Sequence, residues 1–164
     1  MNGLLIGRFQ PFHLGHLEAF QFALSQVDKL CIGIGSSNKP SEKNNPFTAD
    51  ERKDMILSSI EDSILRRIEI FYIPDFENHI EWIKNIDLIV SSFEVVFTND
   101  ELTQVLYRKR GKKVIQVPFK EREIFSGTNI REKIRSDQNW QELVPEGTKT
   151  VLQKIGAKNR LTIL

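Results

Sequence analysis

Short apolar runs alternate along this chain with stretches whose apolar residues recur every three or four positions. The short runs show little alternation of polar and apolar residues, as expected for strands that are buried on both faces of a sheet. Spacings of three and four place apolar side chains on one face of a helix, so the longer stretches predict amphipathic helices. The strand-like runs occupy residues 3–7, 30–35, 68–73, 95–97 and 114–117.

The predicted helices lie between and after these strands. They cover residues 15–27, 48–59, 79–85, 100–109 and the part from 128 onward, with a break at Pro145 and Gly147. Thr48 and Glu51 have the spacing of a capping box, and Gly111 stands where a helix commonly ends in a left-handed glycine. This alternation predicts one α/β domain, residues 1–164, with a five-stranded, mainly parallel, Rossmann-like sheet and helices on both faces.

Composition narrows the classes of function. The 23 basic and 22 acidic residues give a net charge of +1, which argues against a protein that works by neutralising a nucleic-acid backbone. Cys31 is the single cysteine and lies in an apolar run, so we expect a buried structural thiol. The sequence shows no cysteine–histidine cluster, no signal peptide and no run long enough to span a membrane. We therefore expect a cytoplasmic protein without a metal site of its own.

The loop between the first strand and the first helix concentrates polar chemistry. Gly7 lets the backbone turn close to a ligand, and Gly15 opens the helix without a side chain in the way. His13 and His16 are three residues apart, so both imidazoles can face one point. Backbone N–H groups at a helix start favour a phosphate, and Arg8 adds a permanent positive charge.

A lone histidine near a helix start is more often a cap or a surface residue than a ligand contact. Here two of the three histidines of the chain share a ten-residue loop with Gly7 and Arg8. The loop also follows a strand, and ligands of open parallel sheets bind beyond the carboxyl ends of the strands. The pattern therefore favours a phosphate-binding function.

A second polar segment stands at the start of the last long helical stretch. Ser126 or Thr128 is a natural N-cap, whose hydroxyl can serve backbone N–H groups or a phosphate oxygen. Arg131 lies one turn into the helix, with its side chain directed back toward the helix start. A capped helix with a solvated arginine explains the segment equally well, but Lys120 and Arg122 bring further positive charge to the same loop.

Both segments resemble signatures of one family. Gly-Arg-Phe-Gln-Pro-Phe-His-Leu-Gly-His at 7–16 resembles the opening signature of the archaeal-type nicotinamide-nucleotide adenylyltransferases, within the HxGH nucleotidyltransferase superfamily. Ser-Gly-Thr-Asn-Ile-Arg at 126–131 is similar to the family's second signature, which binds the β- and γ-phosphates of ATP. The His-x-Gly-His core marks the superfamily, whereas the residues before it are more specific to this branch.

The resemblance implies transfer of AMP from ATP, with Mg²⁺, to the 5′-phosphate of nicotinamide mononucleotide, by a homo-oligomer that is often a hexamer. It implies catalytic roles for His13, His16, Arg8 and Arg131. The ATP-binding residues that it implies are Gly7, Arg8, Phe9, His13, Gly15, His16, Arg122, Ser126, Gly127, Thr128 and Arg131. Lys120 stays outside this set, because its spacing from the signature varies in the family.

Three further residues are implied on the acceptor side. Trp82 matches the family's tryptophan that stacks on the nicotinamide ring, although core packing is the usual role of such an aromatic residue. Asn45 and Phe47 belong to Asn-Pro-Phe-Thr-Ala-Asp-Glu-Arg, which resembles a family motif with Gly at the position of Asp50. A rigid turn followed by a capping box also accounts for that motif.

The chain departs from the family pattern on this same side. His79 stands where an asparagine is usual, and Thr98-Asn99-Asp100 replaces Ser-Gly-Asn. Phosphopantetheine as the acceptor, or CTP as the donor, is therefore an alternative within the same chemistry. A nucleotide-sensing module without turnover is an alternative of another class. A dinucleotide-binding oxidoreductase is excluded for two reasons. The segment 33–38 has Gly33 and Gly35 but lacks the third glycine of the dinucleotide-binding motif, and it follows the second strand instead of the first.

Overall fold

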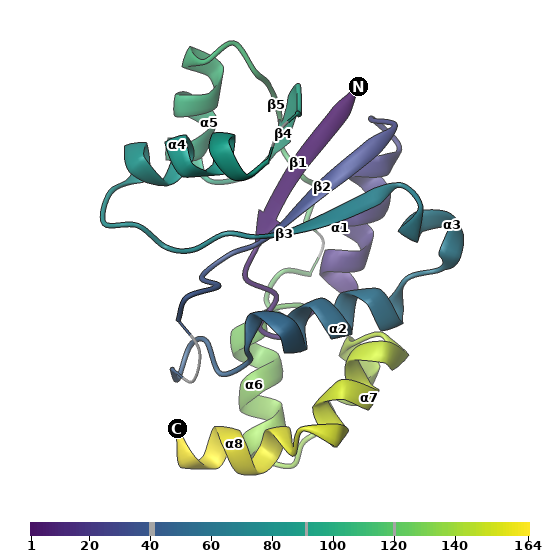
Figure 1. Ribbon diagram of the computed structural model, residues 1–164. Coiled ribbons are helices and arrows are strands. Elements are labelled where there is room, and N and C mark those ends of the chain that lie inside the picture. Colours follow the sequence, from purple (N-terminus) through teal and green to yellow (C-terminus); the bar gives the residue numbers. More distant parts are fainter. Residues whose placement is uncertain (40–41, 91, 120) are drawn as a thin grey trace.

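Five strands form one parallel sheet in this computed structural model, which describes residues 1–39, 42–90, 92–119 and 121–164 (Figure 1). The strand order is β3-β2-β1-β4-β5, and every neighbouring pair is parallel. The predicted α/β class is confirmed, with a sheet that is parallel throughout. The strands are β1 (Asn2–Gly7), β2 (Lys29–Ile34), β3 (Ile68–Tyr72), β4 (Val95–Phe97) and β5 (Lys113–Ile115).

Helices connect the strands and continue after the last one. None of the helices in the described ranges has the length and apolar character needed to cross a membrane. The helices are α1 (Leu14–Leu24), α2 (Ala49–Ser59), α3 (Asp62–Leu65), α4 (His79–Ile89), α5 (Glu101–Lys109), α6 (Gly127–Arg135), α7 (Glu146–Lys154) and α8 (Ala157–Ile163), with a short 3₁₀ turn at Gln141–Leu143.

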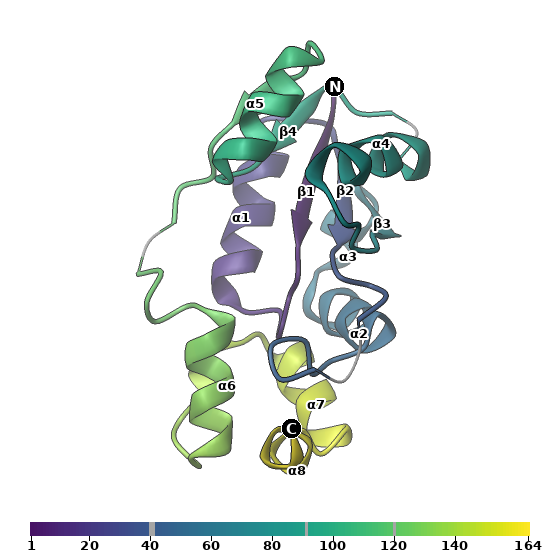
Figure 2. The ribbon, with the colours of Figure 1, turned by 90° about the vertical axis from the view of Figure 1, so that its left-hand side faces the viewer.

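Adjacent residues of one strand enter different cores, which explains why the strands read as continuous apolar runs. In β1, Leu5 packs in a core with Phe20 of α1, whereas Leu4 packs in a second core with Ile83 of α4. Figure 2 shows α1 and α4 on opposite sides of β1. Cys31 is buried in the second core as a free thiol, and burial raises its pKa, as expected for a structural cysteine.

The C-terminal helices α6, α7 and α8 lie beyond the carboxyl ends of the strands (Figures 1 and 2). Helix α7 packs closely on α2, because a Cβ at Gly147 would lie 2.4 Å from the carbonyl carbon and oxygen of Ser58. Arg160 of α8 pairs with Glu51 of α2 through two contacts of 2.5 and 2.9 Å. These contacts hold α7 and α8 against α2, at the carboxyl edge of the sheet.

Most predicted boundaries agree with the structure. Thr48 and Glu51 form both hydrogen bonds of a capping box, and Gly111 has a φ of +78° after α5, so both predictions are confirmed. The predicted break in the last helical part is confirmed at Pro145, the N-cap of α7, but Gly147 lies inside α7 and serves the contact with α2. Helix α4 is longer than predicted, and the short α3 was not predicted.

The strand order places a switch point at the centre of the sheet. The chain builds β1, β2 and β3 toward one edge and then returns to place β4 and β5 on the other side of β1. Loops that leave the carboxyl ends of β1 and β4 therefore diverge and open a crevice between them. The predicted phosphate loop, residues 7–16, begins at this crevice.

Candidate active site at the carboxyl edge of the sheet

His13 and His16 begin α1 and bind each other's backbone. Nδ1 of His13 accepts from the N–H of His16 at 3.3 Å, and Nδ1 of His16 accepts from the N–H of His13 at 3.1 Å. This is a capping box made by two histidines, and their rings stack with centroids 3.6 Å apart. The two histidines therefore do two things: they satisfy two N–H groups at the start of the helix, and they hold each other's rings in a fixed orientation.

These hydrogen bonds determine where each ring carries its proton. A neutral imidazole has one N–H donor and one acceptor nitrogen, and both Nδ1 atoms here are acceptors. Burial lowers the pKa of His13 to about 4. Burial, and then the charge of a protonated His13, lower the pKa of His16 well below 6.5. Both rings are therefore neutral at pH 7, and each has its proton on Nε2, available to a ligand.

Aromatic packing holds the His16 ring in place. The Phe9 ring lies 4.8 Å from it in an edge-on arrangement, and the Phe12 ring stacks at 5.8 Å. The Phe9 side chain is 1% exposed and covers Gly7, where a Cβ would lie 2.8 Å from that ring. The Phe9 side chain therefore belongs to the core, and the implied contact of Phe9 with ATP stays a prediction.

The two segments singled out in the sequence meet at the start of α1. Nη1 of Arg131 donates to the carbonyl oxygen of Gln10 at 2.6 Å. A Cβ at Gly127 would lie 2.9 Å from that oxygen, and a Cβ at Gly15 would lie 3.2 Å from Cβ of Phe125. Glycine at these two positions allows the starts of α6 and α1 to approach, so residues separated by more than 100 positions share one site.

Arg131 is a buried cation at this junction. Its side chain is 6% exposed, and Nη2 lies 3.5 Å from Oγ1 of Thr128. Burial, and then the charge of Arg8, lower the pKa of Arg131 to about 10, so the side chain stays charged at neutral pH. A positive charge beside another arginine favours an anionic ligand between them.

The start of α6 has the predicted cap. Oγ of Ser126 accepts from the N–H of Asn129 at 3.1 Å, so Ser126 rather than Thr128 is the N-cap. Arg122 is exposed in the loop before α6, with its guanidinium 5.3 Å from the centre of the Phe119 ring. Lys120 lies outside the described residues.

Arg52 is a further cation that sequence reasoning did not assign to the site. It is fully buried, and it donates four hydrogen bonds to backbone carbonyls. Three of these carbonyls, of Arg8, Gly35 and Ser36, belong to the loops after β1 and β2. Burial, followed by the charge of Arg8, lowers the pKa of Arg52 to about 10. Arg52 thus joins the two strand ends and orients the backbone at Arg8.

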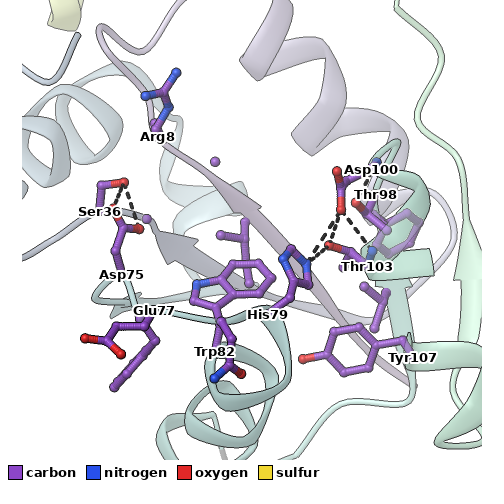
Figure 3. Close-up of a pocket in the computed structure, with 17 residues that line it drawn as sticks. Arg8, Ser36, Asp75, Glu77, His79, Trp82, Thr98, Asp100, Thr103 and Tyr107 are labelled. Carbon is purple, nitrogen blue, oxygen red and sulfur yellow. Dashed lines mark hydrogen bonds and ion pairs between the residues drawn. The ribbon is translucent and has the colours of Figure 1, made fainter. Parts of the chain in front are cut away.

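A cavity of about 590 Å³ opens beside Arg8 at the switch point (Figure 3). It extends from the ends of β1, β2 and β4 to the start of α4 and the inner side of α5. The indole of Trp82 forms part of its wall, in agreement with the implied acceptor role. The polar and charged residues of the lining include Arg8, Ser36, Asp75, Glu77, His79 and Asp100.

His79 and Asp100, two of the residues that depart from the family pattern, are joined through Thr103 in a hydrogen-bonded chain at this cavity. Nε2 of His79 lies 3.0 Å from Oγ1 of Thr103, and that hydroxyl lies 2.6 Å from Oδ2 of Asp100 (Figure 3). Asp100 also caps α5 by accepting from the N–H of Thr103. Asn99 binds both backbone groups of Val117 and so fixes the end of β4 to the chain after β5.

Asn45 and Phe47 are not among the residues that line this cavity, and their implied contact with the acceptor stays a prediction. Phe47 is fully buried in the core, and its N–H and carbonyl are both held by the side-chain amide of Gln10. Asn45 is buried, and its backbone pairs with that of Glu42. The two residues shape the loop that packs beneath the phosphate segment.

Comparison with known proteins agrees with this geometry. The cytidylyltransferase-like family model matches residues 4–133. The nicotinamide-nucleotide adenylyltransferase of Pyrococcus furiosus is 36% identical over 166 residues, which cover 99% of this chain and 88% of that protein. The protein of the same name from Methanolobus tindarius is 38% identical over 156 residues, with 95% and 90% covered.

Solved structures share the fold. A bifunctional NMN adenylyltransferase/ADP ribose pyrophosphatase from Francisella tularensis, complexed with AMP and a manganese ion, has a TM-score of 0.79 at 22% identity and covers 99% of this chain. The present chain spans 52% of that protein, about half its length. A putative nicotinate-nucleotide adenylyltransferase from Vibrio parahaemolyticus has a TM-score of 0.69 at 14% identity, with 96% and 94% covered. By the family match and the near-full-length identities, the chain belongs to the cytidylyltransferase-like family, in the branch of the archaeal-type nicotinamide-nucleotide adenylyltransferases.

Proposed function

We propose that this protein transfers AMP from ATP to the 5′-phosphate of nicotinamide mononucleotide, with NAD and pyrophosphate as products. The observation that carries the proposal is a single juxtaposition at the switch point. Two neutral Nε2–H donors and the buried cation of Arg131 lie at the same edge as a cavity walled by Trp82. Relatives that match almost the whole chain are nicotinamide-nucleotide adenylyltransferases.

The reaction requires positioning more than proton transfer. An oxygen of the acceptor's 5′-phosphate attacks the α-phosphorus of ATP and forms a new phosphoanhydride bond. The bond from the α-phosphorus to the oxygen that bridges to the β-phosphorus breaks, and its electron pair leaves on pyrophosphate. The attacking oxygen is already anionic at neutral pH, so no general base is needed. The protein has to align two anions and stabilise the charge that develops between them.

Each site residue receives a role in that scheme. Nε2–H of His16 donates to the α-phosphate in the transition state, and Nε2–H of His13 donates to the phosphate groups beside it. Both donors are oriented before substrate binds, because the backbone holds each Nδ1. Arg8 and Arg131 neutralise the triphosphate, and the N-terminus of α6 at Ser126 supports its outer phosphates.

Mg²⁺ enters as part of the ATP substrate. Among the described residues, no group of three histidine, cysteine, aspartate or glutamate side chains is placed to hold a metal ion. In proteins Mg²⁺ usually keeps several waters and binds largely through substrate phosphates, so we assign it to the nucleotide. The manganese ion in the complex of the Francisella protein with AMP supports a divalent metal as the companion of the nucleotide.

Pyrophosphate release in a panel of donors and acceptors tests the proposed function. ATP with nicotinamide mononucleotide should give the highest kcat/KM, and CTP or phosphopantetheine should give much less. A higher kcat/KM for either alternative would reassign the donor or the acceptor. ATP binding without pyrophosphate release with every acceptor would identify a nucleotide sensor instead.

The homo-oligomer implied by the resemblance, often a hexamer, stays a prediction. Apolar side chains on the outer surfaces of α4 and α5 support self-association, since Leu88 is 82% exposed and Leu102 is 50% exposed. Sedimentation velocity on the purified full chain tests the prediction directly.

A further inference from the structure

His79 begins α4 at the wall of the acceptor cavity, and its ring has two different neighbours. On one side, Nε2 meets the hydroxyl of Thr103, which is bound in turn to Asp100. On the other side, the ring lies beside the indole of Trp82, with centroids 4.9 Å apart. Figure 3 shows the second ring nitrogen on the side of Trp82, away from the hydrogen-bonded chain.

The direction of this hydrogen-bonded chain follows from its last member. The hydroxyl and the backbone N–H of Thr103 both donate to Asp100 and lower the pKa of its carboxyl, so Asp100 is an ionised acceptor. A threonine hydroxyl has one proton, and here the hydroxyl uses that proton to donate a hydrogen bond of 2.6 Å to the carboxylate of Asp100. Nε2 of His79 must therefore donate to Thr103. In the neutral ring, Nδ1 then presents a lone pair to the cavity.

We propose that His79 selects an acceptor whose ring carries a carboxamide over one whose ring carries a carboxylate, because Asp100 and Thr103 make Nδ1 of His79 a hydrogen-bond acceptor. The inference rests on the proposed function and names the form of the mononucleotide that the site prefers. A planar ring packed on Trp82 brings its edge substituent to the neighbouring His79. A carboxamide offers an N–H to Nδ1, whereas a carboxylate offers only lone pairs.

The charges around His79 act in the same direction. Three carboxylates, of Asp75, Glu77 and Asp100, line the cavity, and Asp100 lies 3.7 Å from Nε2 of His79. Arg8 is the cation of the lining and belongs to the β1 end, next to the phosphate segment. An additional negative charge beside Trp82 is therefore opposed by these carboxylates, whereas a neutral amide is not.

The experiment compares kcat/KM for nicotinamide mononucleotide and nicotinic acid mononucleotide, each with saturating MgATP. The wild-type ratio should favour the amide by at least about tenfold, since a site that accepts an N–H rejects an analogue lacking it. His79→Leu should lower that ratio at least about tenfold through KM of the amide, with KM of ATP unchanged. Thr103→Val should give an intermediate ratio, because the ring loses the partner that orders it.

A second substitution keeps the test independent of simple damage. His79→Lys replaces the lone pair by a cation and should reverse the preference toward the carboxylate form. Ile80→Ala is the matched control, since Ile80 is the next residue of α4 and is 57% exposed. Melting temperature and ATP affinity show whether each variant keeps its fold.

Equal use of both mononucleotides by the wild type overturns the role of His79, and so does an unchanged ratio in His79→Leu and His79→Lys. In both of these results pyrophosphate release continues, so the proposed function stands. Absence of turnover with either mononucleotide, in a wild-type protein that binds ATP, overturns the proposed function itself and the role of His79 with it.

Discussion

The phosphate end of the site and its acceptor end are built in different ways. At the phosphate end, His13 and Arg131 are 4% and 6% exposed, and backbone groups hold them. At the acceptor end, Trp82 and His79 are half-buried, and the side chain of Thr103 from α5 holds His79. The first arrangement is rigid because it reuses the hydrogen bonds of a helix start. The second depends on contacts between side chains, and that of Asp100 also caps α5.

This difference explains why the two ends carry different information. The capping pair of His13 and His16 satisfies α1 and presents donors to a phosphate, so the same residues serve folding and chemistry. The chain His79–Thr103–Asp100 serves the cavity and the start of α5, and two of its members, His79 and Asp100, differ from the family pattern. We therefore propose that the phosphate end sets the type of reaction and that the other end sets the choice of acceptor.

His16→Ala should have the largest effect, because it removes a preorganised donor of the transition state. We expect kcat to fall by about 10²–10³, or about 2.7–4 kcal/mol, in steady-state pyrophosphate release. Glu18→Ala, an exposed change on the same helix, is the control and should leave kcat unaltered. A near wild-type kcat for His16→Ala would remove His16 from the mechanism.

The free energy of unfolding should decrease as pH falls from about 6.5 to about 4. In this window the unfolded chain binds protons on His13 and His16. In the native protein these two rings stay neutral, because burial lowers the pKa of His13 to about 4 and that of His16 well below 6.5. At the lower end of this pH window, His13 contributes about 3 kcal/mol to the loss of unfolding free energy. Urea unfolding across the window should show a weaker pH dependence in His13→Asn, which keeps a capping side chain. Identical pH dependence in both proteins would contradict the buried neutral ring.

Arg52→Met should destabilise the fold by about 2 kcal/mol, because backbone carbonyls after β1 and β2 lose their donor. The loss also frees the backbone at Arg8, so KM for ATP should rise more than KM for the acceptor. Chemical denaturation and steady-state kinetics measure the two effects. Arg66→Met, at an exposed arginine, is the control and should change stability by less than about 0.5 kcal/mol. An unchanged KM for ATP would reduce Arg52 to a purely structural residue.

Trp82→Ala should have the smallest effect, confined to the acceptor end. Loss of a stacking surface is expected to cost about 1–2 kcal/mol and to raise KM for the mononucleotide about tenfold. The kcat at saturation should change little, as for an interaction made equally in ground state and transition state. Lys84→Ala, at an exposed residue of the same helix α4, is the control. A fall in kcat as large as that of His16→Ala would mean that the two ends act as one unit.

The sequence predicted the fold well because strand and helix periodicities are local properties. The alternation of buried strands and amphipathic helices gave the α/β sheet, and Thr48 and Gly111 marked helix ends that the structure confirms. Gly147 misled the prediction, because a glycine that breaks a helix and one that permits close packing look alike. Only the position of Ser58 distinguishes the two.

The part of the site that could be predicted is the part whose residue types and spacing are themselves unusual in a sequence. His13, His16 and Arg131 stood out by spacing and charge, and the structure brings their segments together. Arg52 was not predicted, since its role depends on carbonyls from separate loops that no sequence pattern displays. The burial of Phe47 was not predicted either, because only the packed core shows which aromatic residues remain accessible.

The most direct test of the proposed chemistry follows the α-phosphorus of ATP. ATP labelled at that atom is incubated with nicotinamide mononucleotide, Mg²⁺ and the purified full chain. We predict that the label appears in NAD in one-to-one proportion with released pyrophosphate, and that His16→Ala slows both products together. Pyrophosphate formed without an acceptor, or ATP bound with no label in any product, would contradict adenylyl transfer at this site.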